Sequence, residues 1–155
     1  MIKAFHVSLA AQYTLVQYSR AEPMHCSYVE FDDTGCFVPW DPAVPQSGYF
    51  QANCNCTAEF YVNGLCNAPG DTTWFAVWTM LNVLPPPDGT TGGECGGYDV
   101  AAYKGASRPN LSSSCQRTIK LKTGDKVWPV AGSNQQGLIV PPGSGCNYFE
   151  GKILY

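Results

Sequence analysis

The sequence predicts an all-β fold of the sandwich or barrel type, and three observations lead to that prediction. Apolar and polar residues alternate along several segments, as in Phe5, Val7 and Leu9 against His6 and Ser8. Turn-forming residues separate these segments at short intervals. No segment shows an apolar stripe at helical spacing over three turns. Alternation with a period of two between frequent turns is typical of sheets that bury one face.

Most of the expected strands are short and rich in β-branched and aromatic residues, which favour extended backbone. The most apolar segment, residues 74–83, has a length compatible with a helix or a strand, but its Trp, Phe, Val and Thr residues favour a buried strand. In chain order, the predicted strands cover residues 5–9, 13–18, 28–31, 48–56, 59–62, 74–83, 99–104, 118–122, 126–131, 138–140 and 148–155.

The connections between these strands carry recognisable turn signals. Asp32-Asp33-Thr34-Gly35 predicts a plain turn after the third strand. Asn63-Gly64 predicts a tight hairpin, because this dipeptide tolerates positive φ at both positions. Residues 85–97 consist of Pro, Gly and small polar residues around Cys95, and we expect an ordered surface loop tethered through that cysteine.

Length and composition predict one domain over residues 1–155 and exclude several classes of partner. The net charge is −3 and charged residues are 14% of the chain, against about 25% in ordinary soluble domains. Such a chain lacks the basic patch that nucleic-acid binding requires. No stretch resembles a secretion signal or a membrane helix, so no membrane insertion is expected.

Cysteine is more abundant than a chain of this size needs for a stable core. No Cys-x-x-Cys spacing is present, so the usual zinc and thioredoxin patterns are absent, although His25-Cys26 stays open as half of a metal site. Structural disulfides are the favoured interpretation, with buried thiols as the alternative. On a strand, Cys54 and Cys56 would share a face and suit two different partners rather than each other. The candidate disulfide cysteines, of unassigned pairing, are Cys26, Cys36, Cys54, Cys56, Cys66, Cys95, Cys115 and Cys146.

The residues needed for catalysis are sparse, and the chain is expected not to be an enzyme. The two histidines, His6 and His25, are far apart in sequence, and His6 fits a surface or interface position on a first strand. The glycine-rich run at residues 92–97 lacks the lysine and helix of a phosphate loop. No cofactor is expected. Trp40 and Trp128 sit beside prolines and are candidate surface contact aromatics, with capping of the sandwich ends as the alternative.

Four blocks of sequence, in order, resemble a C1q-like domain, the jelly roll shared with the tumour-necrosis-factor group. The blocks are Ala-Phe-His-Val-Ser-Leu at residues 4–9, the run at 29–37 followed by Pro39 and Gly48-Tyr49-Phe50, Leu-Lys-Thr-Gly-Asp-Lys-Val-Trp at 121–128, and Tyr-Phe-Glu-Gly-Lys-Ile-Leu-Tyr at 148–155. The cysteine-rich middle, residues 54–115, matches the family pattern poorly. The resemblance implies an antiparallel jelly-roll β-sandwich that forms a homotrimer.

Members of this group occur as secreted animal proteins and on bacteriophage particles. A bare domain beginning at Met1 fits the phage case, so our leading hypothesis is a non-enzymatic virion structural protein. It would be a trimeric knob that decorates or cements the capsid through the major capsid protein or other virion proteins, or contacts a host surface glycan during adsorption. The alternatives are a tail-fibre receptor-binding tip, a secreted C1q/TNF-like binding module and a glycan-active enzyme on a jelly roll.

Overall fold

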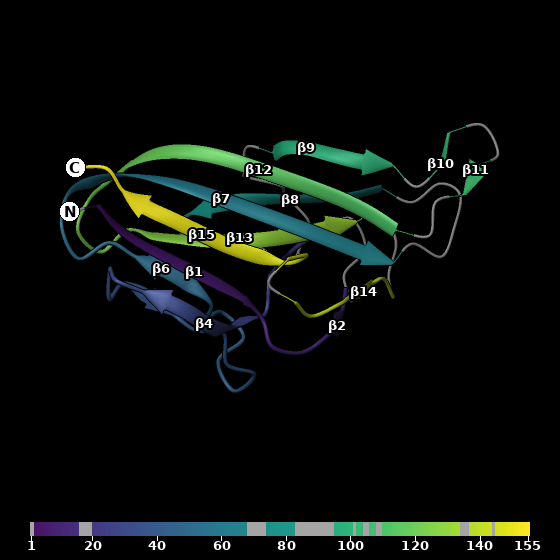
Figure 1. Ribbon diagram of the computed structural model, residues 1–155, viewed down its shortest axis with the longest axis horizontal. Helices are drawn as coiled ribbons and strands as arrows, with labels where there is room; N and C mark the ends of the chain where they lie inside the picture. Colours follow the sequence, from purple (N-terminus) through teal and green to yellow (C-terminus); the bar gives the residue numbers. More distant parts are fainter. Residues whose placement is uncertain are drawn as a thin grey trace.

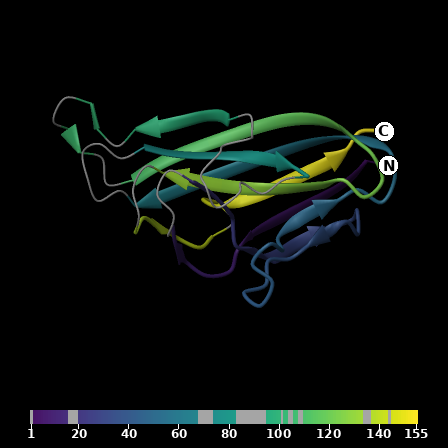
Figure 2. The same cartoon turned by 180° about the vertical axis from the view of Figure 1, so that it is seen from behind.

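The computed structural model describes residues 2–15, 20–67, 74–82, 95–100, 102–103, 106–107, 110–133, 137–143 and 145–155, and these residues form strands and turns with no helix. Every strand pairing among them is antiparallel. Two sheets stack against each other, with the long strands of each running across the molecule (Figure 1; Figure 2). In the described part of the chain, no helix is present that has the length and apolar character to cross a membrane.

The first sheet contains seven strands in the order β2-β14-β7-β15-β1-β4, with β12 on the other side of β7. Its longest ladder joins β7 to β12 over twelve residue pairs, from Cys56↔Leu121 to Asn67↔Asn110. The strands of this sheet are β1 (Lys3–Leu9), β2 (Tyr13–Thr14), β4 (Cys26–Asp32), β7 (Cys56–Asn67), β12 (Asn110–Leu121), β14 (Ile139–Val140) and β15 (Tyr148–Ile153).

The second sheet contains six strands in the order β5-β6-β13-β8-β9, with β3 also paired to β13. A separate two-stranded ribbon joins β10 to β11. The strands of the second sheet are β3 (Arg20–Pro23), β5 (Phe37–Val38), β6 (Tyr49–Gln51), β8 (Trp74–Leu81), β9 (Cys95–Val100) and β13 (Lys126–Ser133), and the ribbon consists of β10 (Ala102–Tyr103) and β11 (Ala106–Ser107).

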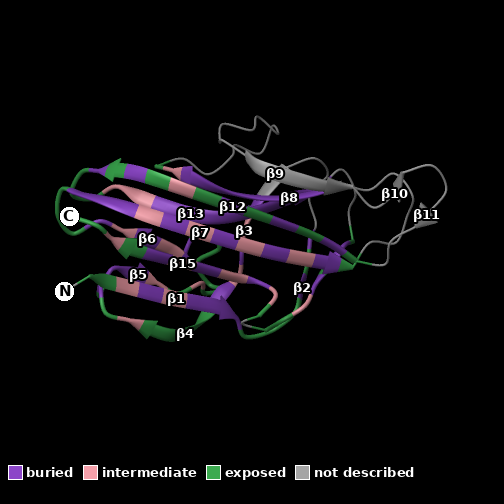
Figure 3. Ribbon diagram, turned by 45° about the horizontal axis from the view of Figure 1, so that its top comes forward, coloured by how far each residue is buried: buried purple, intermediate pink, exposed green. Residues whose placement is uncertain are grey.

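The core between the sheets is organised around a cluster of phenylalanine rings. Phe5, Phe60 and Phe149 project from the first sheet, and Phe37 and Phe50 project from the second. The ring centroids of Phe5 and Phe149 are 5.0 Å apart, and those of Phe50 and Phe60 are 5.2 Å apart. Each ring is buried, which stabilises the fold by about 1.5–3 kcal/mol per side chain. Along the strands of both sheets, buried positions alternate with more exposed ones (Figure 3).

The first and last strands of the first sheet are neighbours. β1 pairs with β15 from Lys3↔Ile153 to Ser8↔Tyr148, so the two ends of the chain lie side by side at one end of the molecule (Figure 1). The pattern that predicted the first strand, with Phe5, Val7 and Leu9 facing inward, is confirmed by their burial.

The predicted hairpin at Asn63-Gly64 is wrong, because β7 runs straight through both residues. Gly64 is buried at this point for a packing reason: a Cβ there would lie 2.3 Å from Val77 Cγ1 of the opposite sheet. The Asn63 amide donates a hydrogen bond to the Cys146 carbonyl at 2.7 Å. The close packing of the two sheets therefore requires a residue without a side chain at position 64. This packing overrides the tendency of Asn63-Gly64 to form a turn.

Two further predicted segments lie partly outside the described part of the chain. The strand expected at residues 13–18 begins as β2, and residues 16–19 are outside the description. Most of the loop expected at residues 85–97 is also outside it, but residues 95–97 belong to strand β9 rather than to a loop. The buried strand expected at residues 74–83 is confirmed as β8 over Trp74–Leu81.

Candidate functional site

The outer face of the first sheet carries the main concentration of functional groups that the described residues offer. Cross-strand pairing aligns outward-pointing side chains in a row: Phe31 on β4, His6 on β1, Glu150 on β15 and Tyr61 on β7. A second row lies two residues further along, with Ser8, Tyr148 and Asn63. We call these two rows, with Glu30, Tyr28, Glu59 and Lys152 beside them, the outer face.

Aromatic rings form a continuous band across the outer face. The His6 ring lies 6.3 Å from Phe31 and 5.0 Å from Tyr148, measured between centroids, and it is roughly parallel to both. The Tyr148 ring is in turn 5.8 Å from Tyr61. Side-chain pairs at these spacings stabilise adjacent strands, so the band is a fixed surface rather than a set of independent side chains.

Both nitrogens of the His6 ring face carboxylates. Nδ1 lies 2.9 Å from Glu150 Oε2, and Nε2 lies 3.8 Å from Glu30 Oε2. The His6 side chain is only 15% exposed, whereas that of Glu150 is 44% exposed. The imidazole is therefore enclosed by its neighbours while the carboxylate remains available to a partner.

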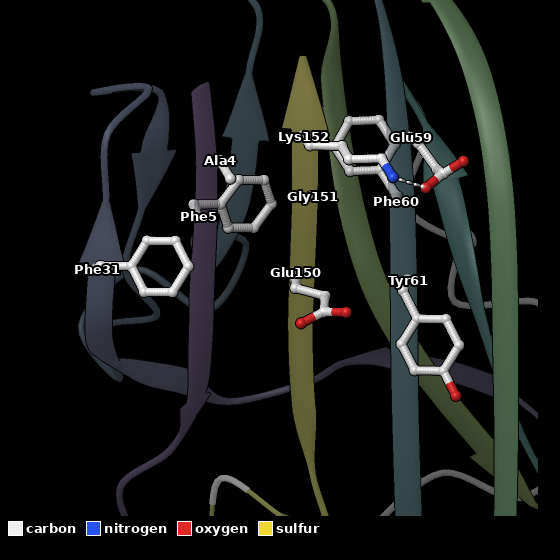
Figure 4. A pocket seen from close by; sticks show the side chains of 9 residues that line it. All are labelled: Ala4, Phe5, Phe31, Glu59, Phe60, Tyr61, Glu150, Gly151 and Lys152. Atoms are coloured by element: carbon white, nitrogen blue, oxygen red, sulfur yellow. Dashed lines mark ion pairs between the residues drawn. The ribbon is translucent and has the colours of Figure 1, made fainter. Parts of the chain in front are cut away.

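A shallow hollow of about 220 Å³ lies beside the band, over Ala4 and Gly151, where side chains are small or absent (Figure 4). At its rim the Lys152 ammonium and the Glu59 carboxylate form an ion pair of 2.7 Å, and the hydrogen bond from Lys152 lowers the pKa of Glu59. Phe31 lies on the opposite side of the hollow from that pair (Figure 4).

The two edges of the first sheet differ in chemistry. On the edge strand β4, Tyr28, Val29 and Phe31 are all exposed apolar side chains, with Phe31 at 46%. On β12, beyond β7, each outward-facing position is an exposed polar residue: Asn110, Ser112, Ser114, Gln116, Thr118 and Lys120. Ile2, Leu154 and Tyr155 add exposed apolar surface at the ends of β1 and β15. Contiguous exposed apolar surface on a soluble protein marks an interaction site.

His25 and Asp32 each contact neighbouring residues of the fold. His25 is stacked between Trp40 and Tyr13, with ring centroids 3.7 Å and 4.0 Å away. Asp32 accepts hydrogen bonds within its own bend from the backbone of Thr34. Within the described ranges, no group of three or more His, Cys, Asp or Glu side chains is arranged to hold a metal ion.

The two candidate contact tryptophans lie in different environments. Trp40 is half-buried and stacks face to face on His25, with 8° between the ring planes. Trp128 is only 7% exposed and belongs to a core cluster with Trp78 and Met80. Its indole N–H donates to the Gln46 carbonyl at 2.8 Å. The expectation of an exposed ring at Trp128 is therefore corrected: Trp128 is the third residue of β13, and its ring packs in this cluster instead of facing solvent.

The candidate disulfide cysteines are spread over both sheets. Cys26 and Cys66 are fully buried in the core of the first sheet, Cys115 is buried beside Trp78, and Cys146 is half-buried. The side chain of Cys95 is outside the described residues.

Cys54 and Cys56 do not share a strand face as expected. β7 begins only at Cys56, which is buried, whereas Cys54 is exposed in a bend at residues 53–55.

Comparison with known structures identifies the fold. The globular domain of zebrafish complement 1qA protein matches with a TM-score of 0.61 at 16% identity, over 99% of this chain and 98% of that chain. Murine APRIL at pH 5.0 gives 0.60 at 9% identity over 99% and 100% of the two chains. Eiger TNF from S. frugiperda gives 0.56 at 13% identity over 100% and 92%. No family model and no curated protein sequence matches the chain.

The class of protein is thus defined by its architecture: an all-β, antiparallel jelly roll of the C1q/TNF type. The fold predicted from the four sequence blocks is confirmed. At identities of 9–16% the likeness establishes the fold and nothing finer.

Sequence reasoning found His6 but not its companions on the outer face. Phe31, Tyr61 and Tyr148 were each visible as members of predicted strands. Only the register of four strands, two of them at opposite ends of the chain, brings these rings together. The alternation of Phe60, Tyr61 and Val62 does indicate that Tyr61 faces away from the core, and this is the signal that would have pointed to it.

Proposed function

We propose that the protein is a non-enzymatic, self-associating C1q/TNF-like module in which three copies pack around a threefold axis through the outer face. The observation that carries this proposal is the continuous aromatic band that ends in the exposed apolar residues of β4. A monomer would leave this surface in water, at a cost of roughly 25 cal/mol for each Å² of apolar area. Packing against a neighbouring copy removes that cost.

The two edges of the first sheet are compatible with a cyclic assembly. The apolar edge at β4 and the polar surface of β12 are different surfaces of the same chain. A contact between two different patches of identical chains is heterologous, and it closes into a ring when the rotation permits. A homotrimer is also what the sequence resemblance to C1q-like domains implies.

The setting we propose for this trimer is the surface of a phage particle. There it would decorate the capsid by binding the major capsid protein or another virion protein, or it would contact a host surface glycan. The low charge of the chain fits a face hidden in a trimer, and its high cysteine content fits a knob that is exposed outside cells. Mass spectrometry of purified particles tests this placement, because a decoration protein is present in them at a fixed ratio to the capsid protein.

A secreted C1q/TNF-like binding module is the second candidate. It is favoured by the structural likeness to complement 1qA, Eiger TNF and APRIL over nearly the whole chain. Recovery of the protein from culture medium in the absence of particles would select this role over the virion role. The proposed trimer is common to both candidates.

The oligomeric state tests the central proposal. Multi-angle light scattering of the wild-type protein should give three times 16.8 kDa. Phe31→Glu places a charge in the centre of the proposed contact, where it would be buried without a partner, and should shift the mass to a single 16.8 kDa chain. Because Phe31 is 46% exposed, the substitution leaves the core of each chain intact.

Val44→Glu provides a matched control. Val44 is also an exposed apolar residue, at 53%, but it lies in the connection between β5 and β6, two strands of the second sheet. This variant should retain the trimer mass. A wild-type protein that remains monomeric at micromolar concentration, or a trimer that tolerates Phe31→Glu, contradicts the proposed interface.

A further inference from the structure

The hollow beside the aromatic band combines aromatic walls with an accessible carboxylate. Phe31 on β4 and Tyr61 on β7 lie on opposite sides of Glu150, which belongs to β15 (Figure 4). Glu150 Oε2 is 2.9 Å from His6 Nδ1, and the Glu150 side chain is still 44% exposed. Because the faces of aromatic rings carry partial negative charge, such rings and a carboxylate together attract a cation.

Negative charge exceeds positive charge around this hollow. Glu150 and Glu30 both face the His6 imidazole, with carboxylate oxygens 2.9 and 3.8 Å from its two nitrogens. The ammonium group at the rim, on Lys152, is already paired with Glu59 at 2.7 Å. Among the residues that the structure describes, Glu30 and Glu150 therefore have no lysine or arginine partner.

The polar row of β12, on the same side of the first sheet, carries the complementary charge. Lys120 is the one charged residue of that exposed row, and it belongs to none of the ion pairs formed by the described residues. Lys120 pairs with Thr57 on β7, whereas Glu150 pairs with Tyr61, two strands away from β12. Sheet spacing places the two Cα atoms roughly 16 Å apart, too far for an ion pair within one chain.

We propose that the hollow receives the Lys120 side chain of a second copy of this chain, and that its ammonium group pairs with the Glu150 carboxylate. This inference rests on the proposed trimer, in which the pair repeats at each heterologous contact. Covered by a neighbouring copy, a hollow of about 220 Å³ would enclose several water molecules against aromatic rings unless a side chain filled it. A lysine suits this position, because its apolar stem packs on Phe31 and Tyr61 while its charged end reaches the carboxylate.

Zero-length cross-linking of the wild-type protein tests the contact directly. A water-soluble carbodiimide activates carboxylates, and a lysine amine in contact with one forms an amide, with net loss of one water from the protein. Covalent dimers and trimers are separated from single chains on a denaturing, reducing gel, and each band is digested and analysed by mass spectrometry. The expected product, present in the dimer and trimer bands, joins the peptide of Lys120 to the peptide of Glu150.

The ion pair between Lys152 and Glu59 serves as an internal reference. Its atoms are 2.7 Å apart within one chain, so this link should form in single chains as well. A monomer mass by light scattering, with the internal link alone, contradicts the proposed trimer. A trimer mass with the internal link present overturns the pair, but not the trimer, if Glu150 is unlinked or is linked to a lysine other than Lys120.

Charge reversal provides an independent measurement. Lys120→Glu and Glu150→Lys each bring like charges together, and each should raise the concentration at which the trimer dissociates by about tenfold or more. Both side chains are accessible to solvent, so the core of each chain is kept.

The double variant restores opposite charges and should recover most of the lost association. Lys126→Glu is the matched control: it makes the same change of charge on β13 of the second sheet, and it should leave the trimer intact. If the wild-type protein is a trimer and the double variant associates no better than the single variants, the assignment of Lys120 to Glu150 is wrong.

Discussion

Gly151 shows how one residue without a side chain supports both faces of the first sheet. A Cβ at this position would lie 2.6 Å from Phe5 Cε1 and 2.9 Å from Phe60 Cδ1, distances that no real contact adopts. The glycine lets the phenylalanine rings of adjacent strands meet beneath β15. On the outer side, the same position forms part of the floor of the hollow beside the aromatic band.

Gly151→Ala should therefore destabilise the protein through overpacking. The added methyl group displaces two buried rings, and we expect a loss of about 1–3 kcal/mol in the free energy of unfolding, measured by urea denaturation. Gly145→Ala is the matched control, because nothing lies within 4 Å of a Cβ placed there. Equal stability of the two variants would show that the core around Phe5 can relax.

At the level of the elements, Asp32 links strand β4 to strand β5. Its Oδ1 accepts hydrogen bonds from the N–H groups of Thr34 and Gly35 at 3.0 and 3.1 Å, and it also accepts one from the Thr34 hydroxyl. Its Oδ2 accepts from the Phe37 N–H at 3.1 Å. One carboxylate thus accepts hydrogen bonds from three backbone N–H groups of the bend, and the sequence prediction of a plain turn at this point agrees with these contacts.

Asp32→Ala should destabilise this connection between the sheets. Several donors lose a charged acceptor at once, so we expect a decrease of about 1–3 kcal/mol in the free energy of unfolding. Thermal or urea denaturation measures this decrease. Asp33→Ala is the comparison, since Asp33 is exposed and adjacent in the same turn. A loss of stability as large in Asp33→Ala as in Asp32→Ala would refute the assigned role.

The sequence predicts the strands better than it predicts what joins them. Period-two alternation located β1, because burial of one sheet face imposes that pattern directly, and aromatic and β-branched composition located β8. Asn63-Gly64 was misassigned because packing of Gly64 against Val77 lies between segments remote in sequence. The outer face was missed for the same reason: its composition depends on strand register, which alternation alone does not determine.

At the scale of the whole molecule, a half-buried histidine makes stability depend on pH. His25 lies between the Trp40 and Tyr13 rings, and burial lowers its pKa from 6.5 to about 4. The unfolded chain therefore binds a proton between these two pH values while the folded chain does not. Protonation favours the unfolded state, so stability falls as pH decreases from 6.5 to about 4.

His25→Phe separates this effect from the titration of carboxylates. The variant keeps an aromatic ring in the stack but cannot be protonated. Its free energy of unfolding, followed by thermal denaturation, should fall less than that of the wild-type protein between pH 6.5 and 4. The two decreases should differ by on the order of 1–2 kcal/mol, a value reduced for the solvent-accessible part of the ring. Parallel curves for the two proteins over this range would exclude His25 as the source.

The pairing of β1 with β15 has a practical consequence. Because Lys3 faces Ile153 across the ladder, a peptide linker of a few residues could join the two ends without disturbing either strand. The covalent order of the strands is therefore separable from their spatial order, and the chain is suited to circular permutation. A break placed in the exposed turn around Val44 would give a rearranged chain whose refolding reports whether assembly of the first sheet must begin with β1.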